Sequence, residues 1–88
     1  MKMIIAILRD SDSEPVSQAL IEQDFRVTRV SSTGGFLRRG LTTLMIGVAD
    51  ERVDEAIEVI KESAAPPVET GIKRATLFVL NVDSFQQV

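Results

Sequence analysis

Residues 25–49 read FRVTRVSSTGGFLRRGLTTLMIGVA and contain two strand-like runs, Phe25–Val30 and Thr42–Ala49, with no helical pattern between them. In the first run, apolar residues alternate with Arg26 and Thr28, which places the two polar side chains on the opposite face of the strand. The second run is apolar on both faces, as in a strand that is buried on both sides. A glycine-rich loop joins the two runs, so the sequence predicts consecutive strands in the middle of the chain.

A strand and a helix are predicted before this pair. The run Lys2–Arg9 is almost continuously apolar and contains β-branched residues, which favours a strand buried on both faces. Ser11 and Glu14 have the spacing of a capping box, and Pro15 suits the first turn of a helix. We therefore expect a helix that begins at this box and ends near residues 23–24.

A second helix and a fourth strand are predicted after the central pair. Asp50 and Glu51 are well placed for the N-terminal dipole of a helix. The apolar residues beyond them repeat at helical spacing: Val53, Ala56, Ile57 and Ile60. Residues 64–67, with two prolines, end this helix, and a polar connection leads to an apolar strand over Ala75–Val82.

The resulting order, β-α-β-β-α-β, predicts an α+β fold of the ferredoxin-like type. In this sandwich a four-stranded antiparallel sheet carries two helices on one face, and we expect residues 1–88 to form a single domain. The first, third and fourth strands are apolar on both sides, so the face without helices is apolar as well. Soluble monomers avoid large exposed apolar patches. The pattern therefore also predicts self-association, with another copy of the chain as the simplest cover.

The composition argues against several kinds of site and partner. The 88 residues include no cysteine and no histidine, which disfavours disulfides, ordinary zinc sites and Cys/His or Ser/His nucleophilic catalysis. A net charge of −3 disfavours a general DNA- or RNA-binding protein. The apolar run near the N-terminus is too short for a signal peptide, and no stretch is long enough to span a bilayer. We therefore expect a cytoplasmic protein without membrane insertion.

Positive charge is concentrated in the central stretch of the chain. Phe25–Ala49 contains no Asp or Glu but four arginines, namely Arg26, Arg29, Arg38 and Arg39. The loop Ser32–Gly40 adds three glycines, whose backbone can approach a ligand closely and whose N–H groups can converge on an anion. Because arginine donors match phosphate geometry, the segment is typical of a phosphate-facing loop. The plainer interpretation is a chance cluster of solvated arginines.

In this setting the sequence resembles the PII-like cyclic-di-AMP receptor proteins. The resemblance covers most of the chain, and its most specific part is the string Thr33-Gly34-Gly35-Phe36-Leu37-Arg38. The other matching segments are Met1–Ile7, Asp10–Ser13, Phe25–Thr28, Gly40, Thr42-Thr43, Gly47-Val48, Arg52–Glu55, Ala75–Leu80, Val82–Phe85 and Gln87.

The resemblance implies a PII-like homotrimer with nucleotide pockets in the clefts between neighbouring subunits. It also implies that the protein binds cyclic di-AMP, with no cofactor, metal or catalytic residue, and relays the signal to an unknown downstream protein. The residues implied to bind the ligand are Arg26, Thr28, Gly35, Phe36, Leu37, Gly47, Phe78 and Gln87. Arginine and glycine backbone suit the two phosphates, and phenylalanine offers stacking surface to adenine.

Three features differ from the family pattern and leave other functions open. Asp24 and Leu41 stand where the family usually has Asn, and the long loop before the last strand is shortened to Ser63–Arg74. These differences favour, as one alternative, a PII-like trimer that senses ATP, ADP or another anion. A second alternative is a structural trimer that binds no small molecule, in which Phe78 is an ordinary core residue. An enzyme is the least supported class, because the basic segment contains no acidic residue.

Overall fold

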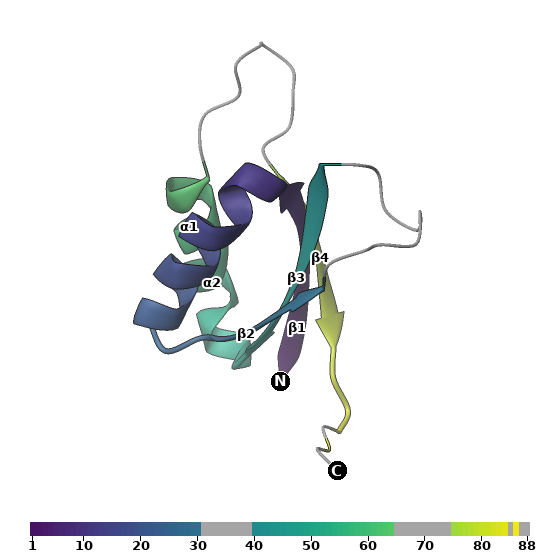
Figure 1. Cartoon of the computed structure of the whole chain (residues 1–88). Helices are drawn as coiled ribbons and strands as arrows, with labels where there is room; N and C mark the ends of the chain where they lie inside the picture. The colour runs from purple at the N-terminus through teal and green to yellow at the C-terminus, as the bar shows by residue number, and fades with distance from the viewer. Residues whose placement is uncertain (31–39, 65–74, 85, 87–88) are drawn as a thin grey trace.

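The structure is a computed structural model of the chain, and it describes residues 1–30, 40–64, 75–84 and 86. The elements are β1 (Lys2–Arg9), α1 (Asp10–Glu22), β2 (Arg26–Val30), β3 (Leu41–Val48), the 3-10 turn η1 (Asp50–Arg52), α2 (Val53–Ser63) and β4 (Ala75–Asn81) (Figure 1). The predicted β-α-β-β-α-β order is confirmed. The strand boundaries differ from the predicted ones by one residue at most.

The four strands form one antiparallel sheet in the order β2-β3-β1-β4. β1 and β3 lie in the centre, and β2 and β4 form the two edges. The register runs straight across the sheet: Thr28 lies opposite Met45, Met45 opposite Ile5, and Ile5 opposite Phe78. This arrangement is consistent with the predicted ferredoxin-like sandwich.

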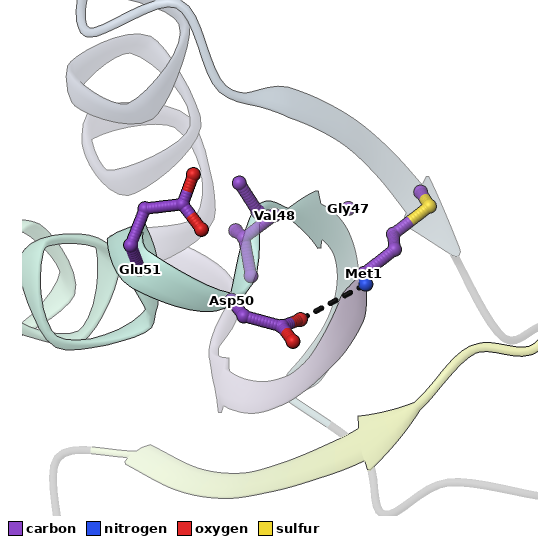
Figure 2. A pocket seen from close by; sticks show the side chains of 6 residues that line it. Met1, Gly47, Val48, Asp50 and Glu51 are labelled. Atoms are coloured by element: carbon purple, nitrogen blue, oxygen red, sulfur yellow. Dashed lines mark ion pairs between the residues drawn. The ribbon is translucent and has the colours of Figure 1, made fainter.

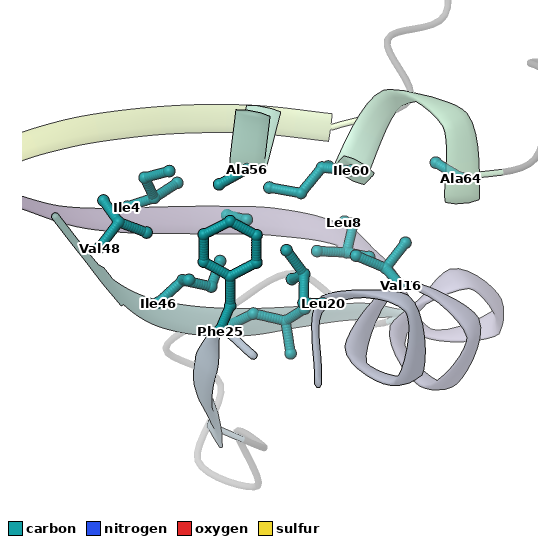
Figure 3. Close-up of a cluster of buried hydrophobic side chains, with 12 residues drawn as sticks. Ile4, Leu8, Val16, Leu20, Phe25, Ile46, Val48, Ala56, Ile60 and Ala64 are labelled. Carbon is teal, nitrogen blue, oxygen red and sulfur yellow. The ribbon is translucent and has the colours of Figure 1, made fainter. Parts of the chain in front are cut away.

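Both helices cover the same face of the sheet (Figure 1). Side chains alternate along each strand, so every second residue of the central strands points toward the helices. Ile4 and Leu8 of β1 and Leu44 and Ile46 of β3 are buried on this side. They join the remaining core residues in one hydrophobic cluster (Figure 3): Ala6, Val16, Leu20, Phe25, Val48, Ala56, Ile60 and Ala64. The core therefore lies between the helices and the sheet.

Neither helix lies on the other face of the sheet, and that face is apolar, as predicted. The alternation assigns to it Met3, Ile5 and Ile7 of β1, Met45 of β3, and Phe78 and Leu80 of β4. Phe78 and Leu80 remain 50% and 46% exposed. We refer to this side as the uncovered face.

The start of α1 differs from the prediction. The helix begins at Asp10, and the capping box predicted at Ser11 does not form. Instead, the hydroxyl of Ser13 donates to the carbonyl oxygen of Asp10 at 2.9 Å, and Thr42 of β3 donates to the Asp10 carboxylate. Pro15 consequently lies in the second turn. The prediction was wrong because a contact from a distant strand, which local spacing does not reveal, helps to fix the first turn.

The buried face of α2 agrees with the prediction, but the start of the helix does not. Ala56 and Ile60 are buried, and Val53 and Ile57 pack against the core. The acidic residues predicted to open the helix form the turn η1 instead, so the α-helix begins three residues later. The prolines predicted to stop it lie outside the described residues.

A tight turn joins the end of α1 to β2. The backbone N–H of Asp24 donates to the carbonyl of Ile21, and that of Phe25 donates to the carbonyl of Leu20, each at 3.0 Å. Asp24 has a φ of 66°, in the left-handed region. Asn and Asp enter this region more readily than other side chains. The backbone alone therefore explains why a short polar residue stands here, as Asn or as Asp.

Candidate functional site

Three of the predicted ligand-binding residues lie together at one edge of the uncovered face. Arg26 is the first residue of β2 and lies opposite Gly47 of β3. Thr28 follows two residues later on the same side of β2, and both side chains are exposed. A guanidinium and a hydroxyl therefore project from neighbouring positions of one edge. Both can donate hydrogen bonds to phosphate oxygens.

Gly47 leaves a gap in the row of side chains beside Arg26. The register places Arg26 on one side of the glycine and Met3 on the other. A Cβ atom at position 47 would lie 3.3 Å from the Cε atom of Met1, so the thioether of Met1 occupies this space. Glycine at position 47 therefore serves a close approach between side chain and backbone.

An open hollow of about 490 Å³ lies beside Gly47 (Figure 2). It is lined by Met1 and by residues 47–51. The α-amino group of Met1 lies 2.9 Å from a carboxylate oxygen of Asp50, and the hydrogen bond between them lowers the pKa of Asp50. Glu51 contributes a second carboxylate to the lining. The hollow thus offers acceptors for amino groups, next to the donors on the β2 edge.

Sequence reasoning missed this hollow. Asp50 and Glu51 appear in the sequence only as acids suited to a helix start. Nothing in the local pattern indicates that Met1 lies beside them, because the contact depends on the pairing of β1 with β3.

Phe78 shares the uncovered face but lies at the opposite edge of the sheet. Thr28, Met45, Ile5 and Phe78 form one row across the four strands. With about 4.8 Å between neighbouring strands, Thr28 and Phe78 are about 14 Å apart. The interpretation of Phe78 as an ordinary core residue does not hold within one chain, because half of its surface is exposed. A single chain does not bring Phe78 to Arg26.

The other four predicted site residues lie outside the described residues: Gly35, Phe36, Leu37 and Gln87. The end of the glycine loop is described, and it is fastened to α1. Gly40 has a φ of 86°, which favours glycine, and its carbonyl accepts a hydrogen bond from the N–H of Asp10 at 2.8 Å. Thr42 is buried and donates to the Asp10 carboxylate. Gly40 and Thr42 thus have structural roles at the base of the loop.

Not every arginine of the basic stretch presents its charge on the uncovered face. Arg29 lies opposite Leu44, on the side of the sheet that faces the helices. Its guanidinium pairs with Glu14 of α1, and this hydrogen bond lowers the pKa of Glu14. The local positive field is therefore weaker than the sequence indicates. Among the described arginines of that stretch, Arg26 is the one on the uncovered face.

Arg52 connects the start of α2 to the turn that precedes Arg26. Its Nε and Nη2 atoms donate to the two carboxylate oxygens of Glu55, each at 3.0 Å. Its Nη2 atom also donates to the carbonyl oxygen of Gln23 at 3.0 Å, and its Cζ atom lies 4.1 Å from the ring centroid of Phe25. The hydrogen bonds between Arg52 and Glu55 raise the pKa of Arg52 and lower that of Glu55.

Two further observations concern other classes of site. Over residues 1–30, 40–64 and 75–84, no three acidic side chains gather closely enough to hold a metal ion. In the same part of the chain, α1 has 13 residues and α2 has 11, and neither combines the length and apolar character that a bilayer span requires.

Comparisons with known proteins agree with the fold and extend beyond it. A sequence model of a family described as "Cyclic-di-AMP receptor" matches residues 1–66, which include Arg26, Thr28 and Gly47. Among solved structures, the crystal structure of a functionally unknown protein from Pediococcus pentosaceus ATCC 25745 is 41% identical in sequence. That match covers 99% of this chain and 96% of the other, with a TM-score of 0.78. The structural similarity therefore includes the last strand.

Proposed function

Because the chain belongs to the cyclic-di-AMP receptor family, we propose that it binds cyclic di-AMP as a signalling receptor and not as an enzyme. The observation that carries the proposal is the placement of Arg26, Thr28 and Gly47 at one edge of the uncovered face. Arg26 supplies a forked donor for a phosphate, Thr28 adds a hydroxyl, and Gly47 lets the ligand approach the backbone. Gly35, Phe36, Leu37, Phe78 and Gln87 complete this proposed site.

The proposed site lies between copies of the chain. Thr28 and Phe78 are about 14 Å apart within one chain, at opposite edges of the sheet. A second copy that covers the apolar face can bring its own Phe78 to the edge that carries Arg26. Repeated contacts of this kind close into a ring, which supports a homotrimer with three equivalent sites. A downstream protein then reads the difference between the free and ligand-bound states.

A receptor for ATP or ADP is the second candidate. Leu41 supports it, because this residue begins β3 and has no side-chain donor where the family usually has Asn. A ligand with other polar groups can suit such a site better than cyclic di-AMP does.

Parallel calorimetric titrations with cyclic di-AMP, ATP and ADP test the proposal. We expect cyclic di-AMP to bind with a Kd below about 1 µM and the other two nucleotides to bind more weakly. Arg26→Ala removes a charged donor and should weaken binding at least about tenfold. Arg29→Ala is the matched control, because it removes the same side chain from the same strand but from the opposite face. It should change the affinity less than about twofold.

Each other outcome has a defined meaning. Tighter binding of ATP or ADP favours the second candidate. No heat with any of the three nucleotides favours the structural trimer. An unchanged affinity in Arg26→Ala removes Arg26 from the site.

A further inference from the structure

We propose that Arg52 is a positioning residue that holds Arg26 in its ligand-binding place, an inference that rests on the function proposed above. Arg52 lies on η1 and shares no sheet register with Arg26. It contacts the two residues on either side of Asp24, just before Arg26 in the chain. Its effect on the ligand would therefore be exerted through the backbone of β2.

The start of β2 needs such support. β2 is an edge strand of only five residues, and all of them except Val27 are exposed. Short edge elements with little buried surface open locally at low free energy. Arg26 is the terminal residue of this strand, so its position depends on what fixes the turn in front of it.

Arg52 fixes that turn at two points. The carbonyl of Gln23 is one of the acceptors left unpaired at the end of a helix, and Arg52 donates to it at 3.0 Å. The guanidinium also lies over the ring of Phe25, which is only 5% exposed. Asp24, between these two residues, has the left-handed φ of the turn. The residues on both sides of this turn are thus held by one side chain.

The guanidinium is itself held from the other side. Two hydrogen bonds of 3.0 Å join it to Glu55 in the first turn of α2. η1 follows directly after β3, the strand in which Gly47 pairs with Arg26. Arg52 thus links the segment that leads into Arg26 with the segment that leads out of Gly47. Both members of this pair in the proposed site are anchored through the same contact.

This anchoring lowers the ordering required when the ligand binds. A receptor whose contact residue is already in place loses less conformational freedom on binding. Without Arg52, Arg26 samples more positions, and the affinity falls although Arg52 does not touch the ligand. The forked guanidinium of Arg26 depends on its orientation more than an ammonium group does.

The test compares Arg52→Met with Lys61→Met. Both variants remove one positive charge and keep an apolar stem, but Lys61 pairs with Glu58 on the exposed side of α2, away from the turn. Amide hydrogen exchange of the ligand-free protein is measured by NMR. In Arg52→Met we expect exchange about tenfold faster at residues 26–30, with the amides of β1 nearly unchanged. Lys61→Met should leave both groups of amides unchanged.

The affinity for cyclic di-AMP provides the second measurement. Arg52→Met should weaken binding about fivefold or more, and Lys61→Met should stay within about twofold of the unmodified chain. In an Arg26→Lys background, Arg52→Met should cost less than about twofold, because the lysine has no fork to orient. An equal loss in both backgrounds would show that Arg52 acts independently of Arg26, and would overturn the inference.

The remaining results also decide. Uniformly faster exchange in all strands would reduce Arg52 to a general stabilising residue. If the unmodified chain does not bind cyclic di-AMP, the proposed function fails, while the exchange data still show whether Arg52 fixes β2. If Arg52→Met does not fold, Arg52→Lys and Glu55→Gln weaken the same contacts more mildly, and unchanged exchange at residues 26–30 in both would overturn the inference.

Discussion

At the scale of the residue, Asp24 is selected by the backbone. Its φ of 66° closes the end of α1, and only glycine and short polar side chains adopt this conformation readily. Its carboxylate also lies at the negative end of the helix dipole, which is unfavourable. Arg52 offsets this charge in part, because the negative charge of Asp24 contributes to the raised pKa of Arg52. Asp24 is thus a tolerated side chain at this turn, and an uncharged amide would suit it better.

Substitutions at this position give a prediction. Asp24→Ala should lower the free energy of unfolding by about 1 kcal/mol, because an alanine Cβ is strained in the left-handed region. Asp24→Asn should leave the stability equal or slightly higher, since the amide tolerates the same φ without a charge at the helix end. Urea unfolding of the three proteins measures both effects. An Asp24→Ala variant as stable as the parent would show that the turn relaxes to another conformation.

Single residues also show how far the sequence reaches. The alternation in the second strand correctly places Arg26 and Thr28 on the face opposite Val27. The same alternation cannot show that Phe78 lies at the far edge, because strand order depends on pairing between distant segments. The bridge from Arg52 to Gln23 has no local signal either, since 29 positions separate the two residues. Periodicity thus predicts the face on which a side chain lies, and tertiary contacts determine its neighbours.

At the scale of the element, the helices confirm this distinction. The apolar spacing in α2 correctly predicts which side is buried, because burial depends on the period of the helix itself. Both helix starts were predicted wrongly. α1 begins earlier because Ser13 and Thr42 bond to Asp10, and α2 begins later because residues 50–52 form η1. A helix start is set by a few hydrogen bonds, and some of them come from other elements.

The first turn of α2 gives a prediction on pH. The hydrogen bonds from Arg52 lower the pKa of Glu55, so the ionised carboxylate stabilises the folded state. This stabilisation is complete above the unfolded pKa of about 4.3 and is lost as the pH falls through the lower pKa of the folded state. Glu55→Gln should therefore be less stable than the parent at neutral pH, and the difference should shrink toward zero in acid. Thermal unfolding between pH 7 and pH 2.5 measures it.

Glu58→Gln is the control for this experiment. Glu58 lies on the same helix, and its contact with Lys61 is a single longer one of 3.5 Å between exposed side chains. Exposed pairs of this kind contribute little to stability. A pH-dependent difference as large in Glu58→Gln as in Glu55→Gln would contradict the specific role of the bonds between Arg52 and Glu55.

At the scale of the whole molecule, the sheet is covered on one face only. The apolar pattern of the first, third and fourth strands predicts an uncovered apolar face, and the register of the sheet confirms it. The two edges also differ in chemistry, since β2 carries Arg26 and Arg29 whereas β4 carries no charged residue. That residues 1–88 form a single PII-like domain which assembles as a homotrimer stays a prediction.

The assembly can be tested with two matched substitutions. Leu80 on the uncovered face and Ile21 on α1 are aliphatic and exposed to a similar extent, 46% and 51%. Leu80→Lys places a charge in the proposed interface and should give monomers, whereas Ile21→Lys should leave the assembly intact. Sedimentation equilibrium should give about 29 kDa for the parent, three times the 9.7 kDa of one chain. A parent that sediments as a monomer, or two variants that behave alike, would contradict the proposed trimer.

The uncharged edge of β4 has a practical consequence. Seven residues of extended backbone, with apolar side chains on both sides, form a template to which other extended chains can add. A copy that has separated from its neighbours is then the species most prone to aggregate, and dilution threatens this protein more than moderate heating. Solutions kept well below the dissociation range should slowly accumulate β-rich precipitate that binds amyloid dyes, and a lysine introduced into β4 should delay it.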